Sequence, residues 1–83
     1  MAEWKEQDNA LVAEWVFEDF SQAFAFMSQV AMAAERAGHH PDWRNVWNKV
    51  SLRLSTHDAG HVVTDKDRAL AGEISRIAKS YGR

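Results

Sequence analysis

The sequence predicts an α+β fold, in which strand segments form one antiparallel or mixed sheet and two amphipathic helices pack on one of its faces. Two observations predict it. Apolar residues alternate with polar ones in some stretches, as in half-buried strands, and recur every three or four residues in others, as in surface helices. These stretches follow one another in the order strand, strand, helix, strand, strand, helix.

The first strand pair is predicted at the N-terminal end of the chain. In LVAEWVFEDF, alternate side chains form an apolar side and a more polar side, and aromatic and β-branched residues are frequent. The apolar side comprises Leu11, Ala13, Trp15 and Phe17. The preceding AEWKEQDNA is interpreted as a short strand that ends in a turn, because QDNA contains the Asp and Asn side chains that favour turns.

The first helix is predicted over residues 20–37, where apolar residues recur at steps of four and three. The apolar stripe, which we expect in the core, comprises Phe20, Phe24, Met27, Ala31 and Ala34. Asp19 or Ser21 would cap the start of the helix. Gly38 lies where a C-terminal glycine belongs, and Pro41 follows shortly after it.

Alternation returns in NVWNKVSLRLST, which predicts one long half-buried strand. Its apolar side would comprise Val46, Val50, Leu52 and Leu54, and its open side Trp47, Lys49, Ser51, Arg53 and Ser55. HDAG would then turn the chain, and HVVT would return as a short strand. The open face of the sheet, with Trp47 on it, would suit a partner subunit.

The second helix is predicted over residues 65–80. Thr64 and Asp67 have the spacing of a capping box at its start, with aspartate in place of the usual glutamate. The core stripe of this helix comprises Leu70, Ile74, Ile77 and Tyr81. Steps of four, three and four between these residues are those of a single helical face.

Length and composition indicate one small folded domain over residues 1–83, with 46% apolar residues and four tryptophans. Ten basic and 12 acidic residues give a net charge of −2, which argues against direct nucleic-acid binding through a basic surface. The absence of cysteine excludes disulfides and thiolate metal sites. Without an apolar run of membrane-spanning length or a signal-peptide pattern, we expect a cytoplasmic location and no membrane partner.

All four histidines fall in one central stretch of the chain. His39 and His40 follow the first helix and His57 follows the long strand, at element ends where functional side chains are commonly displayed. Glu35 in the last helical turn and Asp58 beside His57 would join them in a site that exchanges protons near neutral pH. Such a site suits a reaction that needs one acid and one base.

Other interpretations of these residues remain open. A zinc site is the main rival, but adjacent histidines are poor joint ligands of one ion and no cysteine assists them. His61 alone is most simply a surface histidine, and Trp43 would serve either as a pocket wall or as packing. The chain has no Gly-rich phosphate loop, GxSxG elbow, CxxC pair or HExxH zinc motif.

Three stretches, FEDFSQAFAFMSQVAMAAERAGHHPDW, NVWNKVSLRLSTHDAG and DKDRALA, resemble the pterin-4a-carbinolamine dehydratases. The resemblance implies a four-stranded antiparallel sheet with two helices packed on one face. It also implies a 4a-hydroxytetrahydrobiopterin dehydratase, which forms quinonoid dihydropterin and water and so recycles the pterin used by aromatic amino acid hydroxylases. The family uses no metal and no bound cofactor, since the pterin is the substrate, and its members form homodimers or homotetramers.

The resemblance further implies which residues form the site. The motif histidines correspond to His39 and His57, as acid/base candidates, and to His40, which would bind and orient the pterin. Residues implied to contact the substrate are Glu35, Pro41, Trp43, Ser55, Thr56 and Asp58. Asp67 matches a family aspartate, for which a capping role is the simplest interpretation.

One departure from the family pattern concerns HDAGHVVTDKD, which is one residue longer than the corresponding loop and leaves the role of His61 open. A non-catalytic function is the alternative to the dehydratase, because some relatives act as coactivators that bind a transcription factor or as assembly factors. The complete histidine trio favours the dehydratase, since a relative without catalysis would be expected to lose it.

Overall fold

The computed structural model describes residues 4–83 of the chain. Within these residues, the elements follow the predicted order of two strands, a helix, two strands and a helix. Their bounds are β1 Lys5–Gln7, β2 Ala10–Val16, α1 Phe20–Ala37, β3 Asp42–Val46, β4 Lys49–Leu54, the 3-10 turn η1 His57–Ala59, and α2 Asp65–Lys79. Neither of the α-helices described is both long enough and apolar enough to cross a membrane.

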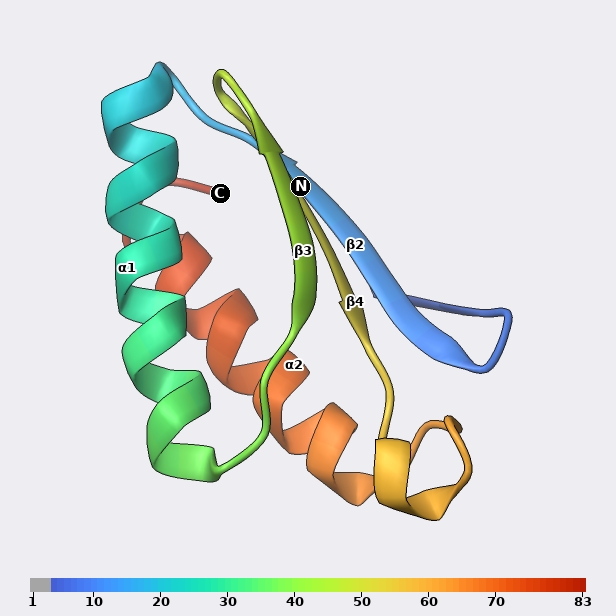
Figure 1. Cartoon of the computed structure of the whole chain (residues 1–83). Coiled ribbons are helices and arrows are strands. Elements are labelled where there is room, and N and C mark those ends of the chain that lie inside the picture. The colour runs from blue at the N-terminus through green and yellow to red at the C-terminus, as the bar shows by residue number, and fades with distance from the viewer. Residues whose placement is uncertain (1–3) are drawn as a thin grey trace.

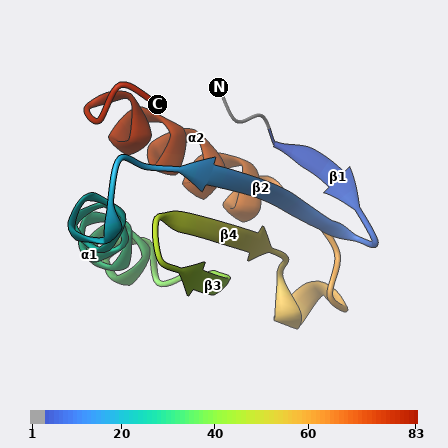
Figure 2. The ribbon, with the colours of Figure 1, turned by 90° about the horizontal axis from the view of Figure 1, so that it is seen from above.

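The four strands form one antiparallel sheet in the order β1-β2-β4-β3. Both helices lie against the same face of this sheet, and its other face is left open (Figures 1 and 2). This arrangement confirms the predicted α+β fold, with its four antiparallel strands and its two helices on one face.

The core lies between the covered face of the sheet and the two helices. Alternate side chains of β2 and β4 point into it, as the two-residue period of a strand requires. The buried side chains are Leu11, Ala13, Trp15, Phe17, Val50, Leu52 and Leu54 from the sheet side and Ala23, Phe26, Val30, Ala33, Ala34, Leu70, Ala71, Ile74, Ile77 and Ala78 from the helices. The apolar sides predicted for β2 and α2 are therefore correct, with Tyr81 half-buried at the end of the second stripe.

The turn between β1 and β2 is made by Asp8 and Asn9. Their φ values are 51° and 63°, and a type I′ turn requires positive φ at both central residues. Asp and Asn are the side chains that best tolerate this conformation after glycine. The prediction of a short strand and a turn is confirmed for the residues described here, and residues 2 and 3 of that segment lie outside them.

The single long strand predicted after the first helix is wrong. The chain reverses in a two-residue turn that begins at Trp47, and β3 pairs with β4 as a hairpin. The Asn45 side chain stabilises this turn by donating to the carbonyls of Trp47 and Lys49, at 3.1 and 2.9 Å. Because the turn contains neither glycine nor proline, the sequence carries no strong turn signal there, and only Asn48 interrupts the alternation. Val46 thus pairs with Lys49 and is exposed rather than in the core, and Trp47 is 66% exposed in the turn.

The strand predicted at HVVT is also wrong. Val62 makes only an isolated bridge with Thr56, while His57–Ala59 forms the η1 turn. The turn predicted at HDAG is confirmed, with Gly60 in the left-handed region at a φ of 88°. Since α2 begins at Asp65, too few residues separate the turn from the helix to form a strand.

Only part of the stripe predicted for α1 lies in the core, since Ala34 is buried and Met27 packs against the core. Phe20 and Phe24 are 50% and 57% exposed, and their rings lie against each other with centroids 6.0 Å apart. The buried face comprises Ala23, Phe26, Val30, Ala33 and Ala34. Apolar residues extend around much of this helix, so the sequence pattern is compatible with either face. Contact with α2 and β4 selects the alanine-rich face, because small side chains allow close approach.

Candidate active site

Three segments meet at one end of the molecule, at the bottom of Figure 1. They are the loop after α1, the η1 turn after β4, and the start of α2. Side-chain hydrogen bonds from α2 reach both of the other segments, and they join residues 28 and 11 positions apart in the chain. The fold therefore brings His39 to the N-terminus of α2, to which the loop that carries His57 is also joined through Thr56.

The end of α1 directs the first two histidines. Gly38 adopts a left-handed φ of 64°, as predicted for a C-terminal glycine, and its N–H donates to the Glu35 carbonyl at 3.1 Å. The N–H of His39 donates to the Ala34 carbonyl at 3.1 Å. Because these bonds satisfy the last free carbonyls of the helix, they also fix the backbone from which the His39 side chain leaves.

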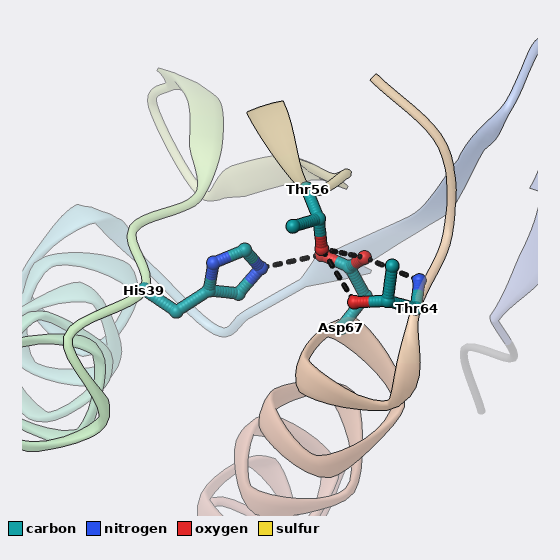
Figure 3. Close-up of polar contacts among 4 residues, drawn as sticks. All are labelled: His39, Thr56, Thr64 and Asp67. Carbon is teal, nitrogen blue, oxygen red and sulfur yellow. Dashed lines mark hydrogen bonds and ion pairs between the residues drawn. The ribbon is translucent and has the colours of Figure 1, made fainter. Parts of the chain in front are cut away.

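A buried carboxylate orients His39 (Figure 3). Nε2 of His39 lies 2.5 Å from Oδ1 of Asp67, and the two side chains are 12% and 0% exposed. An ionised carboxylate can only accept hydrogen bonds, so Nε2 carries the proton and donates it to Asp67. In the neutral ring, Nδ1 then has a free lone pair, and it has no hydrogen-bond partner among residues 4–83. The pair therefore selects the tautomer that accepts a proton at Nδ1.

Asp67 is held by three hydrogen bonds. Besides His39, its donors are the Thr56 hydroxyl at 2.7 Å and the Thr64 backbone N–H at 2.9 Å, and the latter is the predicted capping contact. Burial raises the pKa of Asp67, but the hydrogen bonds from His39, Thr64 and Thr56 outweigh burial and hold that pKa below its usual range. The carboxylate is therefore ionised at neutral pH.

Thr56 connects the loop after β4 to the same carboxylate. Its hydroxyl proton goes to Asp67, so the Thr64 hydroxyl, 2.6 Å away, donates to the Thr56 oxygen. The Thr56 carbonyl also accepts the N–H of His61 at 3.0 Å, which closes the loop on itself. Thr56 is buried and its hydroxyl is committed to these partners, so the structure gives it a role in holding the site together.

His40 and Glu35 form a second pair, at the rim of the site. Nε2 of His40 lies 2.9 Å from Oε1 of Glu35, and both side chains are exposed. An exposed pair of this kind contributes little to stability. Its effect is to orient the His40 ring, and the role of both residues in substrate binding stays a prediction.

His57 lies on the other side of the start of α2. It begins the η1 turn and is exposed. Its ring contacts the ring of His61 edge to face, with centroids 4.4 Å apart and planes at 76°. The loop after α1, which carries His39, and the η1 turn, which begins with His57, lie on either side of the start of α2 (Figure 1).

The other residues predicted to contact the substrate lie at different depths. Pro41 and Ser55 are half-buried, and Asp58 is exposed on η1. Trp43 pairs with Leu52 across the β3–β4 hairpin and packs against the core. Trp43 also lines a hollow on the open face of the sheet, so the structure is compatible with both the packing and the pocket-wall interpretation.

Two surface hollows border the His39–Asp67 pair. One, of about 240 Å³, is lined by His39 and Lys66 with apolar residues of both helices. The other, of about 380 Å³, is lined by Asp58, Thr64 and again Lys66. A larger hollow of about 570 Å³ lies on the open face of the sheet, but none of the histidines lines it. Of the histidines, His39 lines the first of the two smaller hollows, and His40, His57 and His61 line neither. The location of the substrate site stays a prediction.

Sequence analysis alone missed the contact between Asp67 and His39. The sequence assigned Asp67 only to the helix cap, whereas the carboxylate accepts hydrogen bonds both from the Thr64 N–H of the cap and from His39. The available signal was the position of Asp67 as the third residue of the helix, because a carboxylate there points back toward the helix start. The Lys66 side chain, which lines both hollows, was not singled out either.

The zinc interpretation has no geometric support in the described part of the chain. Across residues 4–83, no three or more histidine, aspartate or glutamate side chains are grouped as ligands of one metal ion would be. His39 and His40, although adjacent, are turned to different carboxylates, those of Asp67 and Glu35. Each of the two imidazoles is therefore hydrogen-bonded to a carboxylate of its own.

Known sequences related to this chain share one description. The family model described as "Pterin 4 alpha carbinolamine dehydratase" matches residues 1–77. A protein of Rhodopseudomonas palustris (strain HaA2), provisionally named a pterin-4-alpha-carbinolamine dehydratase, is 46% identical over 99% of this chain and 82% of its own length. A protein of Synechococcus sp. (strain WH7803) with the same provisional name is 47% identical over 89% of this chain and 78% of its own.

Two solved structures resemble the fold. A "transcriptional coactivator/pterin dehydratase" from Brucella melitensis superimposes with a TM-score of 0.86 at 40% identity, over 90% of this chain and 81% of that one. A pterin dehydratase-like protein identified as a RuBisCO assembly factor in the alpha-carboxysome gives a TM-score of 0.74 at 22% identity, over 93% and 88%. At that identity, the second similarity concerns the fold alone.

Proposed function

Because this chain belongs to the pterin 4 alpha carbinolamine dehydratase family, we propose that it converts 4a-hydroxytetrahydropterin to quinonoid dihydropterin and water. The observation that carries the proposal is the buried His39–Asp67 pair, with His57 across the start of α2. Two imidazoles that approach from different loops supply the acid and the base that such a dehydration needs. The proposal requires no metal and no cofactor besides the pterin substrate.

The proposed reaction moves two protons. Nδ1 of His39 removes the proton from the ring nitrogen next to C4a, because Nε2 is engaged with Asp67. The electron pair of that N–H bond forms a double bond to C4a, and the bond from C4a to the hydroxyl oxygen breaks. His57 donates a proton to the leaving oxygen, which departs as water. Exchange with solvent then returns both imidazoles to their starting states, and His57 is exposed to it.

Other residues of the site would bind the pterin rather than transfer protons. His40, oriented by Glu35, would hold the flat heterocycle from the rim. Asp58 lines the hollow beside α2, where carboxylate oxygens suit the amino and N–H groups of a pterin. Pro41 and Ser55 are half-buried and follow His40 and β4 directly, so we assign them to the edge of the site.

The test follows dehydration of freshly generated 4a-hydroxytetrahydropterin by stopped-flow absorbance. The wild type should accelerate the reaction, and His57→Ala should lose about 100-fold or more of that rate while it retains its fold. Lys49→Ala is the control, because Lys49 is exposed on the open face of the sheet, away from the histidines. No acceleration by folded wild-type protein would refute the proposal, and turnover of His57→Ala within about twofold of wild type would refute the role of His57.

A protein-binding function is the second candidate. The observation that favours it is the exposed pair Phe20 and Phe24 on α1, since large apolar side chains grouped on a surface mark interaction sites. The name of the Brucella protein couples coactivator with dehydratase, so the two functions are compatible within one fold. An inactive wild type that binds a protein partner through this pair would make binding the primary function.

We also propose that the chain forms homodimers or homotetramers. Exposed apolar side chains on α1 and at the β3–β4 turn would be covered in such an assembly. β3 adds an unpaired strand edge, which favours association of sheets.

A further inference from the structure

The contact between His57 and His61 has no role in the mechanism above. The two imidazoles meet edge to face, with centroids 4.4 Å apart and an interplanar angle of 76°. This is the geometry that aromatic pairs prefer. His57 begins the η1 turn and His61 follows its last residue by two positions, so one short loop presents both rings.

The backbone of His61 is unusual for a residue with a side chain. Its φ of 61° lies in the left-handed region, directly after Gly60 at 88°. Between residues 4 and 83, the other non-glycine residues with positive φ are Asp8, Asn9 and Trp47, which make the tight turns of the two hairpins. Position 61 belongs to neither hairpin, and glycine would adopt its conformation without strain. A strained side chain at the edge of a site is a feature that function can explain.

The loop that carries both rings is closed by its own hydrogen bonds. The His61 N–H donates to the Thr56 carbonyl at 3.0 Å, and the Gly60 N–H donates to the His57 carbonyl at 3.0 Å. The Thr56 N–H donates to the Val62 carbonyl at 2.9 Å. Because these backbone bonds hold the loop whichever side chain stands at position 61, the imidazole of His61 is free to act on its neighbour.

We propose that His61 is a positioning residue for His57. His57 is exposed, and its side chain is not hydrogen-bonded to any other residue of the described chain, so its ring would otherwise turn freely. The His61 ring limits that rotation and so restricts the directions in which the His57 nitrogens can point. A proton donor acts efficiently only from a narrow range of positions, so this restraint raises turnover. The inference rests on the proposed dehydratase function.

The test compares His61→Gly with His61→Phe. Glycine takes the left-handed backbone without strain, so the Tm of His61→Gly should equal or exceed that of wild type. Its kcat should nevertheless fall about tenfold with little change in KM, because the restraint on His57 is lost. Phenylalanine keeps an aromatic ring beside His57, so kcat of His61→Phe should stay within about threefold of wild type. A kcat of His61→Gly within about twofold of wild type, or equal losses in folded His61→Gly and His61→Phe, would overturn the proposal.

NMR of the imidazole protons separates this inference from the proposed function. In the wild type, cross-relaxation between the His57 and His61 rings and a ring-current shift on His57 are expected. Both the shift and the fixed side-chain angle of His57 should be lost in His61→Gly. If the wild type does not dehydrate the pterin, the proposed function fails, and positioning is then judged by these signals alone. An unchanged His57 spectrum in His61→Gly would contradict the proposal that His61 positions His57.

Discussion

At the scale of single residues, Asp67 joins two functions in one carboxylate. It caps α2 through the Thr64 N–H and holds His39 through Nε2, 28 residues away along the chain. A buried carboxylate is costly unless each of its oxygens has partners, and here three donors provide them. The residue that caps the start of α2 thereby also determines which nitrogen of His39 is free.

Replacing Asp67 by asparagine should lower kcat by about 10- to 1,000-fold, with a smaller effect on KM. The amide can donate a hydrogen bond to Nε2, which would place the proton on Nδ1 and remove the base. Stopped-flow dehydration measures the effect. Glu18→Gln is the matched control, because Glu18 is an exposed carboxylate before the start of α1, at the opposite end of that helix from His39. Equal rates for Asp67→Asn and wild type would contradict the role of the pair.

The lowered pKa of Asp67 also predicts an acid-dependent loss of stability. A carboxylate whose pKa is lower in the folded state binds fewer protons there than in the unfolded chain, so it stabilises the fold above its unfolded pKa of about 3.9. That stabilisation should be lost as the pH falls from about 4 through the folded pKa. Urea unfolding of wild type and Asp67→Asn between pH 7 and 3 measures it. Asp67→Asn should lose less stability on acidification, and parallel curves would contradict the prediction.

His39 and His57 should act as one unit. If each transfers one proton of the same dehydration, the loss in the double alanine variant should be smaller than the product of the two single losses. Single and double variants would be measured in the same stopped-flow assay, with circular dichroism as the control for folding. Losses that multiply would show that the two imidazoles act independently.

At the scale of elements, the ends of the helices are determined locally. Asp19 accepts the N–H of Gln22 at 2.8 Å, and Gly38 ends α1 in the left-handed conformation. These are short-range interactions, so the bounds of α1 follow from its own sequence. The face of α1 that is buried does not follow from its own sequence, because it depends on the side chains of α2 and of the sheet that pack against it.

Two glycine-to-alanine changes should have opposite effects on stability. Gly38→Ala should destabilise the fold by about 1–2 kcal/mol, because alanine is strained at a φ of 64° although no atom lies within 4 Å of the added carbon. Gly72→Ala should stabilise it by about 0.5–1 kcal/mol, since Gly72 lies within α2, is exposed and has free space around it. Thermal unfolding measures both. A stabilised Gly38→Ala variant would contradict the left-handed helix end.

At the scale of the whole molecule, the sheet is covered on one face only, and α1 turns two phenylalanines to solvent. Phe20 and Phe24 are about half exposed, one helical turn apart. A chain of 9.4 kDa has a small core, so covering such side chains by association stabilises it. The surface and the histidine site lie on different parts of the molecule, and each can therefore be altered separately.

Light scattering should give a mass that is a multiple of 9.4 kDa for the wild type. Phe24→Lys should shift the mass toward that of the single chain, because it places a charge within the proposed interface. Val62→Lys is the control, since Val62 is exposed in the loop near the histidines rather than on α1. A wild type that is a monomer, or a Phe24→Lys variant with unchanged mass, would contradict this assembly.

The sequence by itself determined those features of the fold that depend on short-range interactions. The bounds of both helices, the first two strands, the turn at Asp8 and Asn9, and the caps at Gly38 and Thr64 all follow from periodicity and from backbone preferences of a few adjacent residues. The same local reasoning found the histidines at the ends of elements. It did not find the turn at Trp47, because that turn contains neither glycine nor proline and only Asn48 interrupts the alternation.

Only the tertiary structure decided which groups meet. Packing of α1 on α2 and β4 selected its alanine-rich face over the aromatic stripe, because closely packed elements need small side chains between them. Folding also brought Asp67 within 2.5 Å of His39 and closed the loop that places His61 against His57. Contacts between residues far apart in the chain depend on how every intervening element packs, and no local pattern encodes them.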